Sequence, residues 1–191
     1  AIPKFVDIDE ETLCICVESV KNYLSSECVF DGRVTIEKKT GFVVKALMPV
    51  HVYGHPADLN SLRKLAEDYA LAIVEDAAEA LGARYGDEMI GEKSYLCGLS
   101  FNGNKIITTG AGGMVLTNSD EVACNVRHYA NQCKRDGSLF LHDAVGYNYR
   151  MPNINAAIGC AQAKKLPEFL EAKRKIAAVY KEELFSIVGT S

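Results

Sequence analysis

A strand–helix–strand unit between residues 42 and 74 constrains the fold more than any other feature of the sequence. Residues Phe42 to Val50 are nearly all apolar, which is typical of a strand buried on both faces of a parallel sheet. A helix opens at Pro56 and Asp58, and its apolar residues recur with the 3.6-residue period. A second apolar strand follows at Leu71 to Val74. Two strands joined by a helix within about 30 residues predict a right-handed crossover in a parallel sheet, and therefore an α/β fold.

The rest of the chain adds elements of the same kind, although residues 9–41 show no clear pattern. A polar, glycine-rich stretch at residues 102–113 connects two apolar segments, which is typical of a functional loop. We see no internal repeat and no interior linker. Three further strands are predicted at Lys4 to Ile8, Tyr95 to Phe101 and Met114 to Thr117. Three further helices are predicted: one that begins after Ser119, one at Asn155 to Lys164 and one at Pro167 to about Val188.

Composition and charge narrow the possible functions. The chain has 191 residues, of which 48% are apolar and 24% charged, so we expect a globular protein with a sizeable core. Its 21 basic and 25 acidic residues give a net charge of −4, and no basic stripe is present to attract nucleic acid. No apolar run approaches the roughly 20 residues that cross a bilayer, and the first residues show no signal-peptide pattern. We therefore expect a cytoplasmic protein without nucleic-acid or membrane partners.

The seven cysteines include no C-x-x-C pair and no spacing typical of zinc sites. We interpret them as reduced, mostly buried thiols. Cys14 and Cys16 could instead form a metal or redox pair, but strand alternation would place both on one buried face. His51 and His55 are four residues apart, yet a neighbouring glycine and proline disfavour the helix that a zinc pair would need. We expect a turn or substrate-side histidine there, and no metal site.

Three short motifs place polar residues beside the predicted strands. Glu75 and Asp76 end one strand, and Ser100 ends the next strand, five residues before Lys105 in the glycine-rich loop. The third motif covers residues 146–153. Ligands of open α/β sheets bind at the carboxyl ends of the strands. Each motif alone is weak, since a strand-end aspartate is most often a cap or a surface charge and a loop lysine is most often solvated.

In this order and spacing, the motifs resemble those of the DegT/DnrJ/EryC1/StrS family of sugar aminotransferases, which use pyridoxal 5′-phosphate (PLP). The resemblance covers almost the whole chain. It implies the PLP-dependent type I fold, with a three-layer α/β/α large domain around a mainly parallel sheet. The matching segments are Pro49–Gly54, Ala57–Asp58, Val74–Ala78, Ser100–Phe101 with Lys105, Gly146–Arg150, Asn155–Ala157 and Gln162.

The resemblance also implies the domain organisation. Residues 1–165 correspond to the central part of the PLP-binding large domain, and residues 166–191 to a helix that leads toward a small C-terminal domain. Family members begin with a segment that supplies a helix N-terminus for the cofactor phosphate and an aromatic side chain for its ring. Neither this segment nor the small domain is recognisable, so we expect a partial chain.

Two catalytic residues follow from the resemblance. Lys105 would form a Schiff base with the cofactor aldehyde, and its freed amine would move the proton between Cα of the amino donor and C4′ of the cofactor. Asp76 would pair with the protonated pyridine nitrogen and keep the ring positively charged. The presence of Lys105 disfavours a related dehydratase, because such enzymes replace this lysine.

Four further residues match cofactor-binding positions. Ala78 would rest its methyl group on the ring, or is an ordinary core alanine. Glu79 stands where many members have glutamine, and its charge would repel the cofactor's phenolic oxygen unless the carboxyl is protonated or turned away. Ser100 would donate to the phosphate, or bond the backbone as a strand-end serine. Asn148 would reach the phosphate of a neighbouring subunit, or fix a turn; the former implies a homodimer with a shared active site.

The segment from Phe101 to Gly110 looks more like enzymes that aminate C4 of a nucleotide-linked 4-keto-6-deoxy sugar than like those that act at C3. The resemblance thus implies amino transfer from glutamate to such a sugar, for the biosynthesis of bacterial surface polysaccharides or glycans. An alternative is a non-catalytic fragment or binding module of the same fold. A dinucleotide site is disfavoured, since the glycine-rich loop lacks G-x-G-x-x-G spacing and opens no helix.

Overall fold

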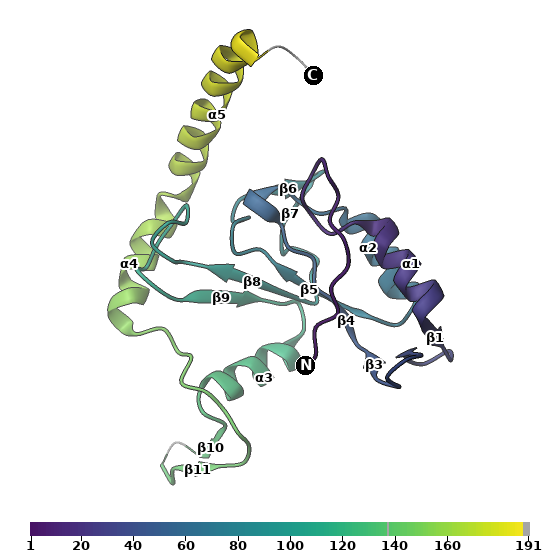
Figure 1. Cartoon of the computed structure of the whole chain (residues 1–191). Coiled ribbons are helices and arrows are strands. Elements are labelled where there is room, and N and C mark those ends of the chain that lie inside the picture. The colour runs from purple at the N-terminus through teal and green to yellow at the C-terminus, as the bar shows by residue number, and fades with distance from the viewer. Residues whose placement is uncertain (137, 189–191) are drawn as a thin grey trace. The chain divides into compact units, whose positions relative to one another are not determined.

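The computed structural model describes residues 1–136 and 138–188 (Figure 1). The chain forms two compact units. The first unit contains residues 1–100 and 113–150, and the second contains residues 101–112 and the chain from residue 151 onward. Among the described residues, no helix is long and apolar enough to cross a membrane.

A four-stranded sheet organises the first unit (Figure 1). β5 pairs in parallel with β4 on one side and with β8 on the other, whereas β9 lies antiparallel to β8. The α/β class and the mainly parallel sheet are thus confirmed. In spatial order, the strands are β4 (Ala46–Leu47), β5 (Ala72–Asp76), β8 (Leu96–Ser100) and β9 (Gly113–Leu116).

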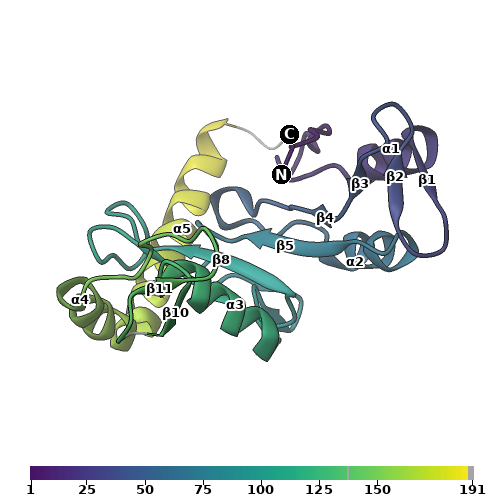
Figure 2. The ribbon, with the colours of Figure 1, turned by 90° about the horizontal axis from the view of Figure 1, so that it is seen from below.

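Helix α2 (Leu59–Asp68) makes the predicted crossover between β4 and β5. It begins where expected, because the Asp58 carboxylate accepts a hydrogen bond from Ser61 N and so caps the first turn. α2 lies beside β5 (Figure 2), and α1 (Val17–Glu27) contacts α2. Their inner faces and the strands enclose the hydrophobic core, which consists of Cys14, Val20, Leu24, Cys28, Leu47, Ala57, Leu62, Ala66 and Ile73.

The prediction of one doubly buried strand from Phe42 to Val50 is wrong. Leu47 and Pro49 are buried, but the residues between and around them are exposed, so the segment is covered on one face. Pro49 has no N–H group to donate to a ladder, and the pairing beyond it is reduced to one bridge between Val50 and Asp76. Before Pro49, the segment is divided into two short strands that belong to different sheets.

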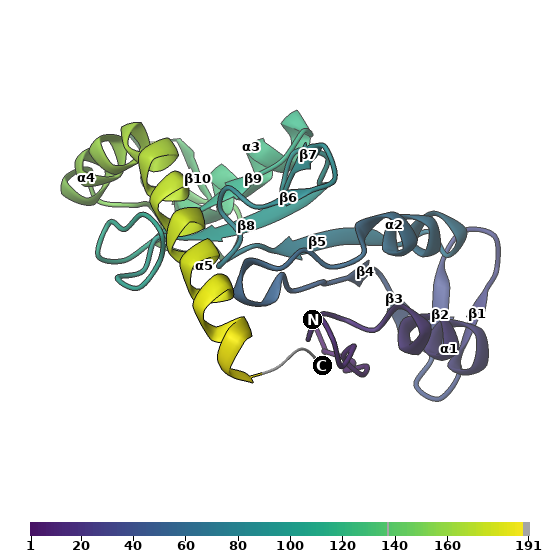
Figure 3. The same ribbon diagram turned by 90° about the horizontal axis from the view of Figure 1, so that it is seen from above.

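The first of these strands, β3 (Val43–Val44), completes a three-stranded antiparallel sheet with β1 (Cys28–Phe30) and β2 (Thr35–Glu37). Figure 3 shows this sheet beside α1. The predicted strand at residues 4–8 is also wrong, since its backbone pairing consists of a single bridge between Ile8 and Ile15.

The remaining elements of the first unit are the 11-residue helix α3 and several short elements. Helix α3 begins as predicted, because the Ser119 hydroxyl accepts a hydrogen bond from Val122 N. These elements are η1 (Val52–Gly54), β6 (Arg84–Tyr85), β7 (Glu88–Met89), α3 (Asp120–Ala130), β10 (Lys134–Asp136) and β11 (Leu141–His142).

The second unit consists of the glycine-rich loop and two helices, α4 (Asn153–Lys164) and α5 (Leu166–Val188), both of which were predicted. The loop folds back on itself, with Thr109 N donating to Phe101 O at 3.0 Å. Asn155 of α4 donates its side-chain amide to Thr109 O at 2.5 Å. The loop is thus held against the start of α4.

All seven cysteines lie among the described residues and are free thiols, as expected. Most are buried, but Cys124 and Cys160 are exposed. Cys14 is buried and its thiol donates to His55 O at 3.3 Å, whereas Cys16 is only partly buried. The predicted burial of both residues of this pair is therefore only half right.

Candidate active site

Asp76 ends β5, and hydrogen bonds restrain its main-chain N–H, its carbonyl and its side chain. Its N–H donates to Pro49 O at 2.9 Å, and its carbonyl accepts from His51 N at 3.0 Å. Its side-chain Oδ1 accepts from Ala78 N at 3.0 Å. The partly buried carboxylate is therefore fixed at the carboxyl end of a central strand, as the sequence predicted.

Ser100 lies at the same edge of the sheet as Asp76. Asp76 pairs with Gly98 of β8, and Ser100 is the last residue of that strand. Because β5 and β8 are parallel, their carboxyl ends meet at one edge. The structure thus brings a carboxylate and a hydroxyl together on neighbouring strand ends.

The two residues that follow this strand end also stay close to it. Ala78 is partly buried, and Ala77 before it donates its N–H to Gly98 O at 2.9 Å. Glu79 is exposed, and its carboxylate accepts a hydrogen bond from Tyr53 N at 3.0 Å. The Glu79 carboxylate is thus bound to the η1 turn.

The same turn contacts the backbone of Glu79. Gly54 has φ of +82°, and a Cβ atom at this position would lie 3.0 Å from Glu79 O, so only glycine fits without strain. Tyr53 also adopts a positive φ, of 52°. Two sequence motifs far apart in the chain, residues 49–54 and 75–79, therefore form one structural element around Asp76.

Lys105 lies in the second unit. It is partly buried in the glycine-rich loop, where its N–H donates to Asn102 O at 3.1 Å and closes a turn. The same loop contains buried Thr109, which packs against Gly159 of α4. The packing is close, because a Cβ atom added at Gly159 would lie only 3.0 Å from Thr109 Cγ2. The turn that carries Lys105 therefore rests on a loop packed against α4.

Asn148 lies elsewhere in the first unit, and its side chain is exposed. A bridge joins it to Asn131 at the end of α3, and its neighbours Tyr147 and Tyr149 stack with ring centroids 5.0 Å apart. The backbone is thereby pinned while the amide faces outward. The bridge to Asn131 fits the predicted turn residue, and the exposed amide fits the predicted residue that reaches another subunit.

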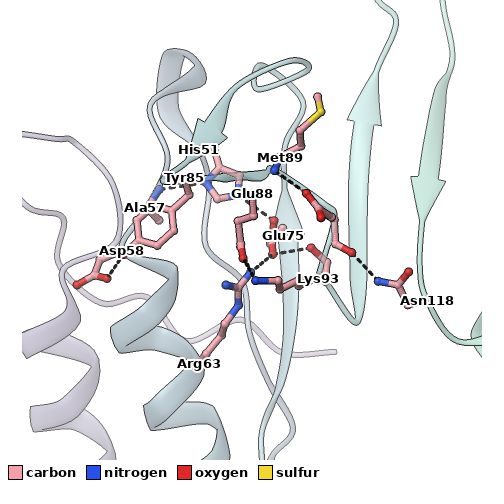
Figure 4. Close-up of polar contacts among 12 residues, drawn as sticks. His51, Ala57, Asp58, Arg63, Glu75, Tyr85, Glu88, Met89, Lys93 and Asn118 are labelled. Atoms are coloured by element: carbon pink, nitrogen blue, oxygen red, sulfur yellow. Dashed lines mark hydrogen bonds and ion pairs between the residues drawn. The ribbon is translucent and has the colours of Figure 1, made fainter.

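A buried polar network that no sequence pattern indicated lies behind Asp76. His51 and Glu75 are fully buried, and His51 Nε2 lies 3.2 Å from Glu75 Oε2. Figure 4 shows His51 and Arg63 meeting at Glu75. Burial raises the pKa of the Glu75 carboxyl, but hydrogen bonds from His51 and Ser94 and the charge of Arg63 outweigh it and hold the pKa below its ordinary value. Motif spacing gives no signal for a pair that meets only in the fold.

A separate group of possible metal ligands consists of His128, Cys133 and Asp143. His128 Nε2 is already 2.7 Å from Asp143 Oδ1. Burial and the nearby Asp143 charge raise the pKa of the Cys133 thiol and favour its neutral form. The group thus consists of a His128–Asp143 hydrogen bond beside a buried cysteine.

Comparison with known proteins agrees with this geometry. The sequence model of the DegT/DnrJ/EryC1/StrS aminotransferase family matches residues 1–191. The chain belongs to this family. A GDP-perosamine synthase of Vibrio cholerae is 41% identical over 184 residues, which are 96% of this chain and 46% of that protein. A GDP-perosamine synthase of Escherichia coli O157:H7 is 38% identical over 188 residues, which are 98% of this chain and 47% of that protein.

Solved structures extend the likeness to the fold. A DegT DnrJ EryC1 StrS aminotransferase from Brucella abortus matches with a TM-score of 0.85 and 28% identity, over 96% of this chain and 47% of that one. S. venezuelae DesV, solved with a ketimine intermediate, matches with a TM-score of 0.82 and 31% identity, over 97% of this chain and 45% of that one. The predicted type I fold is therefore confirmed. The chain spans about half the length of these family members.

The edge formed by β5 and β8 fits the PLP that this family uses. PLP has three parts that a protein can bind: a ring nitrogen, which pairs with a carboxylate, a flat ring face, and a phosphate. Asp76 offers a fixed carboxylate, Ala78 a small side chain beside it, and Ser100 a hydroxyl at the same edge. These groups are of the right chemical kinds for the three parts of the cofactor.

Proposed function

We propose that the full-length protein containing this chain is a PLP-dependent aminotransferase that transfers the amino group of glutamate to C4 of a nucleotide-linked 4-keto-6-deoxy sugar. The observation that carries the proposal is the arrangement of Asp76 and Ser100 on adjacent parallel strand ends, in a chain of an aminotransferase family. The two relatives named GDP-perosamine synthase favour GDP as the nucleotide.

Bound PLP would supply an electron-accepting ring and the carbon that carries the amino group between the two substrates. Asp76 would hold a proton on the ring nitrogen, because its ionised carboxylate is fixed and partly shielded from water. Ser100 would donate its hydroxyl to the phosphate. Ala78 would lie against the ring, where a larger side chain would leave less room.

Lys105 would hold the cofactor covalently and move the proton that leaves Cα of the amino donor. Such a lysine must reach the reacting carbon in a defined position. The hydrogen bonds that fold the glycine-rich loop onto α4 support this role, since they restrain the turn that carries Lys105.

Glu79 would keep its carboxylate on Tyr53 N, which would direct its charge away from the cofactor's phenolic oxygen. The exposed side chain of Asn148 would donate to the cofactor phosphate of a second subunit, so we propose a homodimer with a shared active site. Free thiols are typical of reducing compartments, and we place the protein in the cytoplasm.

Amino transfer from ¹⁵N-labelled glutamate tests the proposal. The full-length protein with PLP is incubated with GDP-, UDP- and dTDP-linked 4-keto-6-deoxy sugars, and the products are analysed by mass spectrometry. We expect a ¹⁵N-amino sugar, formed fastest from the GDP-linked substrate, and none from the Lys105→Ala variant. Absence of a ¹⁵N-amino product with every sugar would refute the proposed reaction.

A further inference from the structure

The buried network behind Asp76 has no part in the roles proposed above (Figure 4). Its centre is Glu75, the residue before Asp76, together with His51. Consecutive residues of a strand point to opposite faces, so Glu75 projects into the interior from the same strand end that presents Asp76. A shift of the backbone at this strand end would therefore displace both carboxylates.

The protons of this network are assigned by its hydrogen bonds. Ala57 N donates to His51 Nδ1 at 3.1 Å, so Nδ1 carries no proton. The ring proton then lies on Nε2 and is donated to Glu75 Oε2. Ser94 Oγ donates to Glu75 Oε1 at 2.5 Å, and Arg63 Nη2 lies 4.0 Å from the same oxygen. The Glu75 carboxylate is thus held from three directions.

His51 is joined to the end of β5 at two points. Its main-chain N–H donates to Asp76 O, while its side chain donates to Glu75. Pro49 O accepts from Asp76 N on the other side of the same residue. The network therefore limits both translation and rotation of the peptide units that flank Asp76.

Stability alone is a weak reason for such a network. A buried charged group loses its hydration, and replacing buried ionic groups by apolar residues of similar size is often neutral or stabilising. Active-site groups, in contrast, need placement to within about 0.5 Å, which buried and fully satisfied hydrogen bonds provide. The burial of Glu75, despite its cost in free energy, is thus better explained by a need to fix the position of Asp76 than by stability.

We infer that His51 and Glu75 are positioning residues, which fix the strand end so that the Asp76 carboxylate meets the ring nitrogen of PLP. The inference rests on the proposed function. It predicts that the contribution of His51 to cofactor binding passes through Asp76, so the two residues should be energetically coupled.

A double-mutant cycle on the full-length protein tests this coupling, with the dissociation constant of PLP measured by absorbance titration. His51→Leu removes both side-chain hydrogen bonds with a side chain of similar size. We expect it to weaken PLP binding by about tenfold when Asp76 is present, but by less than about twofold in the Asp76→Asn variant. His51→Gln is the matched control, because its amide can accept from Ala57 N and donate to Glu75, and it should stay within about threefold of the wild type.

Equal weakening by His51→Leu in both backgrounds would show a purely structural role and overturn the inference. If His51→Leu does not fold, the same cycle with Glu75→Gln decides. Ser94 and His51 donate to different oxygens of Glu75, and an amide keeps an acceptor at only one of these two positions. A wild-type protein that does not bind PLP would overturn the proposed function as well. Wild-type binding without coupling would overturn this inference alone.

Discussion

The hydrogen bond from Asn155 to Thr109 O should control the stability of the loop that carries Lys105. Thr109 is buried, and its carbonyl accepts the Asn155 amide at 2.5 Å. Asn155→Ala leaves this acceptor without that donor, and an unsatisfied buried group costs about 1–3 kcal/mol. At 1.4 kcal/mol per factor of ten, the opening equilibrium of the loop should rise by about 5- to 150-fold.

Hydrogen exchange on the full-length protein measures this opening directly. The amides of Phe101 and Thr109, which donate to Gly112 O and Phe101 O, should exchange faster in Asn155→Ala by the stated factor. Asn153→Ala makes the same replacement at an exposed position in the first turn of α4 and should leave the exchange unchanged. Equal exchange in the two variants would refute the view that Asn155 anchors the loop.

Three further predictions concern the first unit. Asp76→Asn should raise the barrier of the glutamate half-reaction by more than about 3 kcal/mol in stopped-flow assays while PLP still binds; near-normal rates would make Asp76 structural. Leu62 is fully buried, so Leu62→Ala should lower the free energy of unfolding, measured by chemical denaturation, by about 2–5 kcal/mol. Lys64→Ala, at an exposed position of the same helix, should change it little. Hydrogen bonds from Thr40, Lys4 and Tyr23 lower the pKa of Glu37 from 4.5 to about 2. The ionised Glu37 therefore stabilises the folded protein fully above pH 4.5, and this stabilisation is lost as the pH falls toward 2. Measured against pH, the free energy of unfolding of Glu37→Gln should fall less steeply on the acid side than that of the wild type.

Sequence patterns located the elements that depend on local signals. The Asp58 and Ser119 caps and the apolar period of α2 fixed helix starts, because these interactions lie within one turn of the chain. Helix α1 was missed because it buries only two residues, Val20 and Leu24, among polar neighbours. The strand expected at residues 42–50 failed because apolar content does not reveal which faces are covered, nor that Pro49 interrupts the ladder.

The candidate site likewise contains residues that the sequence could locate and residues that it could not. The positions of Asp76 and Ser100 at neighbouring strand ends were predictable from the polar residues that follow apolar strands, whereas their roles rest on the family resemblance. The His51–Glu75 pair was not, because its members are 24 residues apart and each is individually an unusual residue to bury. The hydrogen bond from Tyr53 N that binds the Glu79 carboxylate likewise depends on a turn that the sequence alone does not position.

The central claim is that this chain supplies the PLP-binding lysine of an aminotransferase. Borohydride reduction of the full-length protein with bound PLP, followed by peptide mass mapping, tests it most directly. We expect a pyridoxyl mass on Lys105, and we expect it to be lost when the protein is treated with excess glutamate before reduction. A pyridoxyl mass on another lysine, with the Lys105 peptide unmodified, would contradict it.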